Sequence, residues 1–467
     1  MERLSPKTVL PAHVLRPAYD RAALTPGMVH IGIGAFHRAH QAIYTDAALA
    51  VEFGPWGIVG VSLRSTAIAQ DMRAQGGLYS VMTRDGDADS ARVVGSEIDA
   101  LAATQERARL LALLTDPAIR IVTLTVSEKA YGFDPSTGRL DPTHPAVAAD
   151  LATPDTPTGA IGMLVEGLAR RHAAELPPFT VLCCDNLPAN GRLVRRLVLD
   201  MAERRDAPLA AWIAEKGRFP SSMVDRIVPA ATDETRARAA ALIGAQDTLA
   251  LETEAFSQWV IEEDFVDGRP AWEAGGALFV ADVEPYEKMK LRLLNGSHSL
   301  IAYLGQLHGL DHVRDVMAVP AHVARVRAHM EAAAATLDPV PGIDLAAYRA
   351  QLVARFANPA MAHRTVQIAM DGTQKLPQRI FAPAVEALAS GGDADAFAYV
   401  TALWLAYVRR MGPVNDPRAA ELAAAESEGG SAPFFALPGL FPAQLVTSTD
   451  WRQRVALHFS ALEAAGR

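Results

Sequence analysis

Cysteine is nearly absent from this chain, because its 467 residues include only Cys183 and Cys184. Adjacent cysteines rarely bridge each other, so we exclude a disulfide scaffold and expect a reducing, cytoplasmic environment. Two cysteines without a converging set of histidines also argue against a structural zinc site. The sequence therefore predicts a cytoplasmic protein that works without a metal.

Long apolar runs and clusters of basic residues are absent as well. No stretch reaches the roughly 18 apolar residues that a membrane helix needs, and residues 1–10 lack the uninterrupted apolar core of a signal peptide. Lysine and arginine total 44 against 53 acidic residues, and no basic run forms a nucleic-acid footprint. We therefore expect neither a membrane nor a nucleic acid as a partner.

What the chain does contain is a high share of hydrophobic residues, 50%, in a length sufficient for two domains. In the first part, runs typical of buried strands alternate with helical stretches such as residues 37–51. The strand-like runs are residues 28–34, 57–63, 119–126 and 179–184. Strands that are apolar nearly throughout indicate a parallel sheet covered on both faces. Residues 78–83 and 92–94 predict an antiparallel excursion from this sheet.

The pattern changes near residue 285, where alanine-rich helical spacing replaces β-branched runs. Residues 321–335, 345–356 and 394–410 all have this spacing. The sequence therefore predicts an α/β domain over residues 1–280, followed by an all-α domain over residues 281–467.

A glycine-containing turn follows the first predicted strand and opens the first helix. A dinucleotide-binding turn occupies this position, where the first glycine permits the tight turn and the second lets the backbone approach a pyrophosphate. His37 stands where the usual fingerprint has a third glycine, and Gly60 and Gly77 show that glycines occur here without an implied ligand. The residues that we expect to contact the cofactor at this turn are Gly32, Ile33, Gly34, Ala35 and Phe36.

The end of the second strand leaves the choice of coenzyme open. An acidic residue there usually holds the adenosine ribose of NAD, but the chain reads Leu63-Arg64-Ser65-Thr66-Ala67. The Arg64 guanidinium would suit the 2′-phosphate of NADP instead.

Three polar residues close together in the sequence are candidates for catalysis. Oxidation of an alcohol requires a group that accepts the hydroxyl proton, and Lys290 with a depressed pKa can do this. The side chains of Asn295 and His298 can hold the developing alkoxide by hydrogen bonding.

Each of these residues also has a purely structural interpretation. Lys290 lies between Lys288 and Arg292 in a pattern that fits a solvated helix face, and His298 fits a buried core histidine. The Asn295-Gly296 pair is typical of a turn, which would interrupt the helix between Lys290 and His298.

Motifs spread along nearly the whole chain resemble the polyol-specific long-chain dehydrogenases, also called the mannitol dehydrogenase family. They are Gly32-Ile-Gly-Ala-Phe-His-Arg-Ala-His-Gln41, Asp185-Asn-Leu-Pro-Ala-Asn-Gly191, Phe219-Pro-Ser-Ser-Met-Val-Asp-Arg-Ile-Val-Pro229, Gln258-Trp-Val-Ile-Glu262 and Lys290-Leu-Arg-Leu-Leu-Asn-Gly-Ser-His298.

The resemblance implies a Rossmann-type N-terminal domain, an all-α C-terminal domain, an active site between them, NAD as coenzyme and no metal. It implies Lys290 as the catalytic acid/base, with Asn295 and His298 as the pair that holds the oxyanion. Asn186 and Asp225 fall on substrate-binding positions, and Glu287 falls on a carboxylate that passes protons to solvent. NADP stays open as the coenzyme. The mannitol dehydrogenases look to carry acidic residues about where this chain has Thr66 and Ala67, so the feature that would favour NAD is absent here.

Two lysines bear on the choice between a uronate and a polyol substrate. A uronate carboxylate that is taken out of water should meet a cation. Lys129 stands at a position where fructuronate reductases look to have lysine and mannitol dehydrogenases look to have glycine. Lys375 keeps a substrate-site lysine, and Gln367 stands where mannitol dehydrogenases look to have an arginine. We expect reduction of D-fructuronate to D-mannonate. The alternatives are a mannitol or arabinitol dehydrogenase. In that case Lys129 simply pairs with Glu128 or solvent, and Gln367 is family drift.

Two other classes of protein are also possible. A nucleotide-binding sensor would need no proton acceptor such as Lys290, and a zinc-dependent polyol dehydrogenase would need a Cys/His ligand set. The sequence leaves open a monomer or a small homo-oligomer, with a small sugar-derived molecule as the binding partner.

Overall fold

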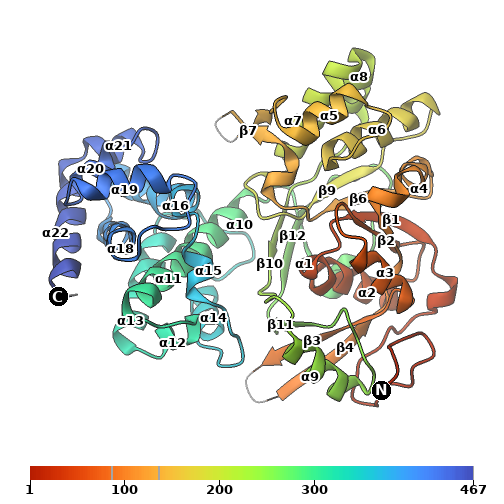
Figure 1. The fold of residues 1–467 in the computed structure, drawn as a ribbon, viewed down its shortest axis with the longest axis horizontal. Coiled ribbons are helices and arrows are strands. Elements are labelled where there is room, and N and C mark those ends of the chain that lie inside the picture. The colour runs from red at the N-terminus through yellow and green to blue at the C-terminus, as the bar shows by residue number, and fades with distance from the viewer. Residues whose placement is uncertain (86–87, 135–136, 466–467) are drawn as a thin grey trace. The chain divides into compact units, whose positions relative to one another are not determined.

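The computed structural model describes residues 1–85, 88–134 and 137–465. The chain divides into two compact units, Met1–Val283 and Glu284–Arg467. Figure 1 shows the helices and strands with their labels.

The first unit is built on a sheet of five parallel strands in the order β5-β2-β1-β6-β9. Its strands are β1 (Pro26–Ile31), β2 (Gly57–Ser62), β5 (Glu97–Ala102), β6 (Ile121–Leu124) and β9 (Thr180–Cys183). β2, β6 and β9 lie within their predicted runs, and β1 begins two residues before its run. The parallel sheet is confirmed. β5 was not predicted, because its Glu97 and Asp99 break the apolar pattern of a buried strand.

Both faces of this sheet are covered, since alternate strand residues enter two different apolar cores. Val29 and Val122 belong to the core under α4, α6 and α7, whereas Met28 and Ile121 belong to the core under α1, α2 and α3. In Figure 1, α5, α6, α7 and α8 lie together beside β9. The helices of this unit are α1 (Ala35–Ala39), α2 (Gln41–Val51), α3 (Ala67–Ala74), α4 (Ala103–Thr115), α5 (Pro145–Ala152), α6 (Ala160–Ala173), α7 (Asn190–Arg205), α8 (Ala207–Lys216) and α9 (Asp233–Ile243).

The helix predicted over residues 37–51 is divided into α1 and α2. The division falls at His40, whose φ of −131° and ψ of −91° are not helical. Its ring nitrogen Nε2 lies 3.0 Å from the carbonyl oxygen of Gln258. A tertiary contact therefore accompanies a break that local composition did not predict.

The predicted antiparallel excursion is confirmed by the pairing of β3 (Tyr79–Asp85) with β4 (Ala88–Val94). β11 (Leu251–Glu254) extends this sheet by pairing parallel to β3. A further sheet has the order β10-β12-β13, and β7 and β8 pair by themselves. These strands are β10 (Ser222–Asp225), β12 (Gln258–Glu262), β13 (Leu278–Val280), β7 (Phe133–Asp134) and β8 (Arg139–Leu140).

The described residues of the second unit form helices joined by loops, with one isolated β-bridge between His312 and Arg364. The predicted helical character is confirmed, and α11 packs against α13, α15 and α18. The α-helices are α10 (Glu284–Met289), α11 (Gly296–His308), α12 (Val313–Met317), α13 (Pro320–Ala334), α14 (Leu345–Phe356), α15 (Thr365–Ala369), α16 (Gly372–Leu376), α17 (Ala382–Ala389), α18 (Asp395–Met411), α19 (Ala419–Ser427), α20 (Ala432–Phe435), α21 (Ala443–Thr447) and α22 (Thr449–Ala465). Two π-helices, η4 (Lys290–Asn295) and η5 (Pro377–Phe381), join α10 to α11 and α16 to α17. Across the part of the chain that the structure describes, no helix is both long and apolar enough to span a bilayer.

Candidate active site

The residues predicted from the sequence to act in binding or catalysis fall into two sets. The glycine turn, Arg64, Lys129, Asn186 and Asp225 belong to the first unit. Lys290, Asn295, His298 and Lys375 belong to the second.

The turn after β1 requires glycine at its first position. Gly32 has a φ of +106°, and a Cβ atom there would lie 2.1 Å from the carbonyl oxygen of Thr125. The turn is held in place because Gly32 donates to the carbonyl of Val61 at 2.7 Å and accepts from Thr125 Oγ1 at 2.7 Å. Any larger residue would therefore strain the backbone and collide with the loop after β6.

The second glycine of the turn has a different environment. Gly34 is exposed and precedes α1, and a Cβ atom there would find no neighbour nearer than 3.8 Å. The space beside its backbone is open, as the close approach of a pyrophosphate requires.

The other predicted cofactor residues differ in exposure. Ile33 is buried against Gly60, so its side chain belongs to the core and only its backbone faces the turn. Ala35 and Phe36 are half-buried, and the Phe36 ring stacks on His40 at 5.0 Å. Arg64 is exposed just after β2, where it is available to a ligand.

Sequence reasoning missed what His37 does in place of the third glycine. Its Nε2 lies 3.1 Å from Oε1 of Glu97, and both side chains are buried. Its ring stacks on His30 at 3.3 Å, and His30 Nε2 lies 3.0 Å from the carbonyl oxygen of Gly32. Burial raises the pKa of Glu97 to about 7 and lowers the pKa of His37 to about 3. A buried glutamate and two histidines therefore pack beneath the Gly32 turn. In the sequence, the only sign of this cluster was His37 in the position of the usual third glycine.

Three loops of the first unit share one edge of the sheet. β1, β6 and β9 are parallel neighbours, so the segments after their carboxyl ends lie side by side. These segments carry the Gly32 turn, Lys129 and Asn186. The loop after β9 is also bonded to β10, because Ser222 Oγ of β10 donates to the carbonyl of Cys183 at 2.7 Å. β10 ends at the buried Asp225. Ligands of open α/β sheets bind at such an edge.

Lys129 is exposed on the short 3₁₀-helix η2 (Glu128–Tyr131). Among the described residues it forms no ion pair, so it does not pair with Glu128, and its exposure is consistent with the other structural interpretation, contact with solvent. An exposed cation on this loop is available to an anionic group of a ligand.

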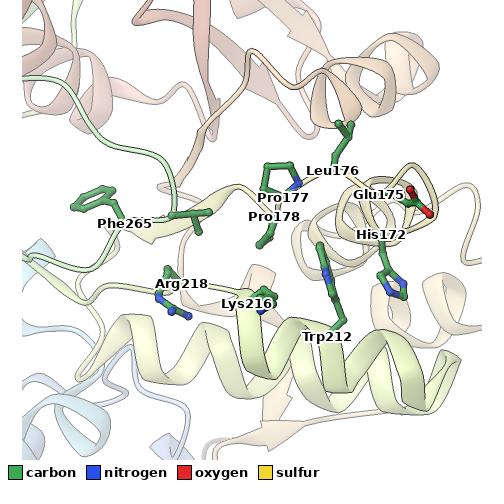
Figure 2. Close-up of a pocket in the computed structure, with 10 residues that line it drawn as sticks. His172, Glu175, Leu176, Pro177, Pro178, Trp212, Lys216, Arg218 and Phe265 are labelled. Atoms are coloured by element: carbon green, nitrogen blue, oxygen red, sulfur yellow. The ribbon is translucent and has the colours of Figure 1, made fainter.

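Another part of the first unit carries a pocket that contains none of these residues. It has a volume of about 690 Å³ and lies near the amino end of β9, away from the edge described above. Figure 2 shows Trp212 and Lys216 extending from α8 toward Pro177 and Pro178. Its two cations are already engaged, because Lys216 pairs with Glu215 at 2.7 Å and Arg218 with Asp264 at 3.1 Å.

In the second unit, Lys290, Asn295 and His298 lie on one uninterrupted helical run. Asn295 and Gly296 have φ of −72° and −62°, both helical, so the expected turn at this pair is wrong. The chain instead forms the π-helix η4 from Lys290 to Asn295 and continues as α11. A π-helix shifts the direction of the side chains without ending the helix, and it often marks a functional site.

The interpretation of this segment as a solvated face is also wrong. Lys290 is only 7% exposed and Arg292 is buried, whereas Lys288 is exposed and pairs with Glu284 at 2.8 Å. A lysine buried in this way is unusual unless its burial serves a purpose.

The π-helix is held by side chains from distant parts of the unit. Arg292 makes a bidentate pair with Glu386, with both bonds at 2.6 Å, and also donates to the carbonyl of Thr336 at 2.7 Å. Nε2 of His329 lies 3.3 Å from the carbonyl oxygen of Arg292. These contacts fix a helical register that local propensity does not favour.

Two buried nitrogen atoms of this segment, Asn295 Nδ2 and His298 Nε2, have no hydrogen-bond partner among the residues that the structure describes. Such unsatisfied groups call for an explanation, and a bound oxygen atom would provide one. The His298 ring packs on Phe356 and His363 at 4.7 and 5.2 Å. Burial, and then the charge of neighbouring cationic groups, keeps the pKa of His298 well below its usual value. The imidazole is therefore neutral, and neutral hydrogen-bond donors can hold an oxyanion.

Lys375 lies on α16 and is partly buried. Its Nζ donates to the carbonyl of Met370 at 2.6 Å, and Asp371 Oδ2 lies 3.9 Å away. Burial, and then the charge of Arg379, lowers its pKa. Gln367 is exposed on α15, and Glu287 is half-buried on α10 one turn before Lys290.

Two family models match this chain. Residues 26–274 match the mannitol dehydrogenase Rossmann domain, and residues 282–438 match the mannitol dehydrogenase C-terminal domain. The chain belongs to the mannitol dehydrogenase family. The resemblance of the motifs is thereby confirmed, as is the fold of a Rossmann-type domain followed by a helical one, and the protein is an oxidoreductase.

Individual members of the family are similar over most of their length. The chain is 47% identical over 403 residues to the uncharacterized oxidoreductase YeiQ of Escherichia coli (strain K12), covering 85% of this chain and 82% of that one. It is 41% identical over 464 residues to the D-mannonate oxidoreductase of the same organism, covering 96% of each. The structure of Pseudomonas fluorescens mannitol 2-dehydrogenase, a ternary complex with NAD and D-mannitol, superposes with a TM-score of 0.88 at 37% identity, covering 99% of this chain and 97% of that one.

Proposed function

We propose that this oxidoreductase reduces D-fructuronate to D-mannonate with NADH, or catalyses the reverse reaction. The observation that carries the proposal is Lys129, an exposed cation without an ion-pair partner among the described residues, on the loop beside the Gly32 turn. A substrate carboxylate needs such a cation, and a neutral polyol does not. The similarity to D-mannonate oxidoreductase supports this choice of substrate.

The residues of the first unit fit a dinucleotide. The open space at Gly34 accommodates a pyrophosphate, and Arg64 stands where the adenosine ribose would lie. NAD, when bound, supplies or accepts the hydride. NADP is the second candidate, because Arg64 can pair with a 2′-phosphate and no carboxylate follows β2.

The residues of the second unit supply the acid/base chemistry. During reduction the C5 carbonyl carbon receives the hydride, and the Lys290 ammonium gives its proton to the oxygen. Asn295 Nδ2 and His298 Nε2 hold that oxygen while it carries negative charge. In the reverse direction neutral Lys290 accepts the hydroxyl proton, and Glu287 passes it to solvent. Lys129 and Lys375 bind the substrate carboxylate, and Asn186 and Asp225 bind its hydroxyl groups.

The second candidate function uses the same chemistry on mannitol and fructose, or on arabinitol and xylulose. The similarity to mannitol 2-dehydrogenase favours it. Gln367 and Lys129 weigh against it, because neither matches the residues that mannitol dehydrogenases look to have at these positions.

The test follows NADH and NADPH oxidation with fructuronate, fructose and xylulose as separate substrates. We expect turnover of fructuronate with NADH to exceed the others, and Lys129→Gln to raise the KM for fructuronate roughly 10- to 100-fold, the worth of one charge-assisted bond. Lys216→Gln, which removes an exposed lysine near the amino end of β9, serves as the matched control and should leave KM unchanged. Turnover of fructose or xylulose with none of fructuronate would replace the proposal by its alternative.

A further inference from the structure

One carboxylate holds both ends of the loop that carries Lys129. Asp185, two residues beyond the end of β9, accepts from the backbone N–H of Val126 at 2.9 Å and of Ser127 at 3.1 Å. It also accepts from the Tyr131 hydroxyl at 2.6 Å. The segment of residues 126–131 is therefore bonded at its start and at its end to one side chain of a neighbouring loop.

The backbone of this loop is strained at Ser127. Its φ of +76° and ψ of 154° fall in a region that residues other than glycine rarely adopt. Such a conformation costs about 1–3 kcal/mol and persists only where the surroundings enforce it. The N–H of the strained residue is itself bonded to Asp185, so this carboxylate is part of what enforces the conformation.

The anchor at the other end is rigid. Tyr131 is fully buried, and its hydroxyl also lies 3.1 Å from Cys183 Sγ in β9. Asp185 is in turn located by Asn190, whose Nδ2 donates to its carbonyl at 2.9 Å. Lys129 is exposed between the two anchored ends, so the position of its backbone depends on a side chain that is 56 residues away in the sequence.

We infer that Asp185 is a positioning residue, which holds residues 126–131 in a strained conformation and so places Lys129 to receive the substrate carboxylate. The inference rests on the proposed function for the identity of that carboxylate. It adds a residue that touches neither substrate nor cofactor and acts on substrate selectivity through the loop.

The test is a double-mutant cycle on Asp185 and Lys129. Asp185→Asn replaces one acceptor oxygen by an N–H₂ group that cannot bond the loop N–H groups. We expect it to raise the KM for fructuronate roughly tenfold, the usual loss for one such contact, with little change in kcat and none in the KM for fructose. Added to Lys129→Gln it should cause little further loss, because a misplaced lysine and an absent one are equivalent. Equal effects on fructuronate and fructose, or effects that add in the double variant, would overturn the inference.

Asp150→Asn is the matched control. Asp150 is a buried carboxylate of the first unit and, like the half-buried Asp185, accepts from two consecutive backbone N–H groups, those of Thr158 and Gly159 at 2.7 and 2.9 Å. It should lower stability by a similar amount and leave the selectivity for fructuronate over fructose unchanged. Tyr131→Phe keeps the buried ring and removes only the hydroxyl bond. It is expected to shift the selectivity in the same direction, and it decides the question if Asp185→Asn does not fold.

Hydrogen exchange separates this inference from the proposed function. Asp185→Asn or Tyr131→Phe should speed exchange in peptides covering residues 126–131 roughly tenfold or more, whereas Asp150→Asn should not. Unchanged exchange there refutes the positioning role, whichever substrate is preferred. If exchange accelerates but the unmodified enzyme turns over only a polyol, the proposed function fails while the loop anchor stands.

Discussion

The guanidinium of Arg379 donates from Nη1 to the backbone carbonyl of Asn295 at 3.3 Å. The same atom donates to Ser299 Oγ at 3.2 Å, one turn further along α11. Burial lowers the pKa of Arg379 to about 10, so the side chain is still charged at neutral pH. A cation from η5 thus holds the end of the π-helix from which the Asn295 side chain extends.

Replacement of Arg379 by methionine should therefore impair catalysis through Asn295. We expect kcat to fall roughly 10- to 100-fold while the KM changes little, because a displaced oxyanion donor affects the transition state more than the ground state. Arg418→Met removes an arginine whose one ion-pair partner among the described residues is Glu421 on α19, and it should leave kcat unchanged. Steady-state kinetics measures both, and an Arg379→Met enzyme with normal kcat would remove the positioning role.

Lys290→Ala should abolish most turnover without weakening coenzyme binding. Loss of a general acid/base lowers kcat by roughly 10²- to 10⁴-fold. The control is Lys288→Ala, since Lys288 is exposed two residues earlier and, within the described part of the chain, forms its ion pair with Glu284 alone. Stopped-flow rates and NADH fluorescence titration measure the two effects. If both variants lost activity equally, the segment would matter for folding and not for proton transfer. Unchanged turnover in Lys290→Ala would show that another group transfers the proton.

The two glycines of the turn should fail in different ways when replaced by alanine. Gly32→Ala places a Cβ atom on the Thr125 carbonyl at a positive φ, so we expect it to lower the free energy of unfolding by about 2–4 kcal/mol. Gly34→Ala enters open space and should leave the melting temperature nearly unchanged. It should still weaken NADH binding, because the added methyl group occupies the space of the pyrophosphate. Thermal unfolding and NADH titration distinguish the two, and normal NADH affinity in Gly34→Ala would contradict the assignment of the turn.

Glu97 should make stability depend on pH near neutrality. Burial raises its pKa from 4.5 to about 7, so between these values the folded protein holds a proton that the unfolded chain releases. The stabilisation is complete below about pH 4.5 and is lost as the pH rises through 7. The loss amounts to roughly 3 kcal/mol at most.

Glu97→Gln removes this titration and keeps the shape of the side chain. The stability of the unmodified protein relative to this variant should therefore fall between pH 5 and pH 8 in urea unfolding experiments. His37 is present in both proteins, and burial lowers its pKa to about 3, so its contribution is common to the two stability curves. Parallel stability curves would show that Glu97 does not gain its proton on folding.

The fold was largely predictable because its signals are local. Apolar runs and helical spacing depend on residues close together in the sequence, and they located β1, β2, β6, β9 and most long helices of the second unit. β5 was missed because Glu97 and Asp99 do not look buried. Glu97 is buried against His37 of α1. Asp99 pairs with Arg73 of α3 and Arg109 of α4. All three partners lie outside β5, so the pattern within the strand does not reveal them.

The sequence by itself determined the class of fold and the position of the glycine turn, because each depends on residue types at short spacing. Its motifs also resembled those of the family. The sequence also determined which residue types are present for proton transfer and for binding a carboxylate. Tertiary structure alone decided that Asn295-Gly296 continues a helix and that Lys290 is buried. It also decided that Asp185 and Arg379 anchor distant backbone. The physical reason is that burial and hydrogen bonding are set by partners tens of residues away, which spacing along the chain does not record.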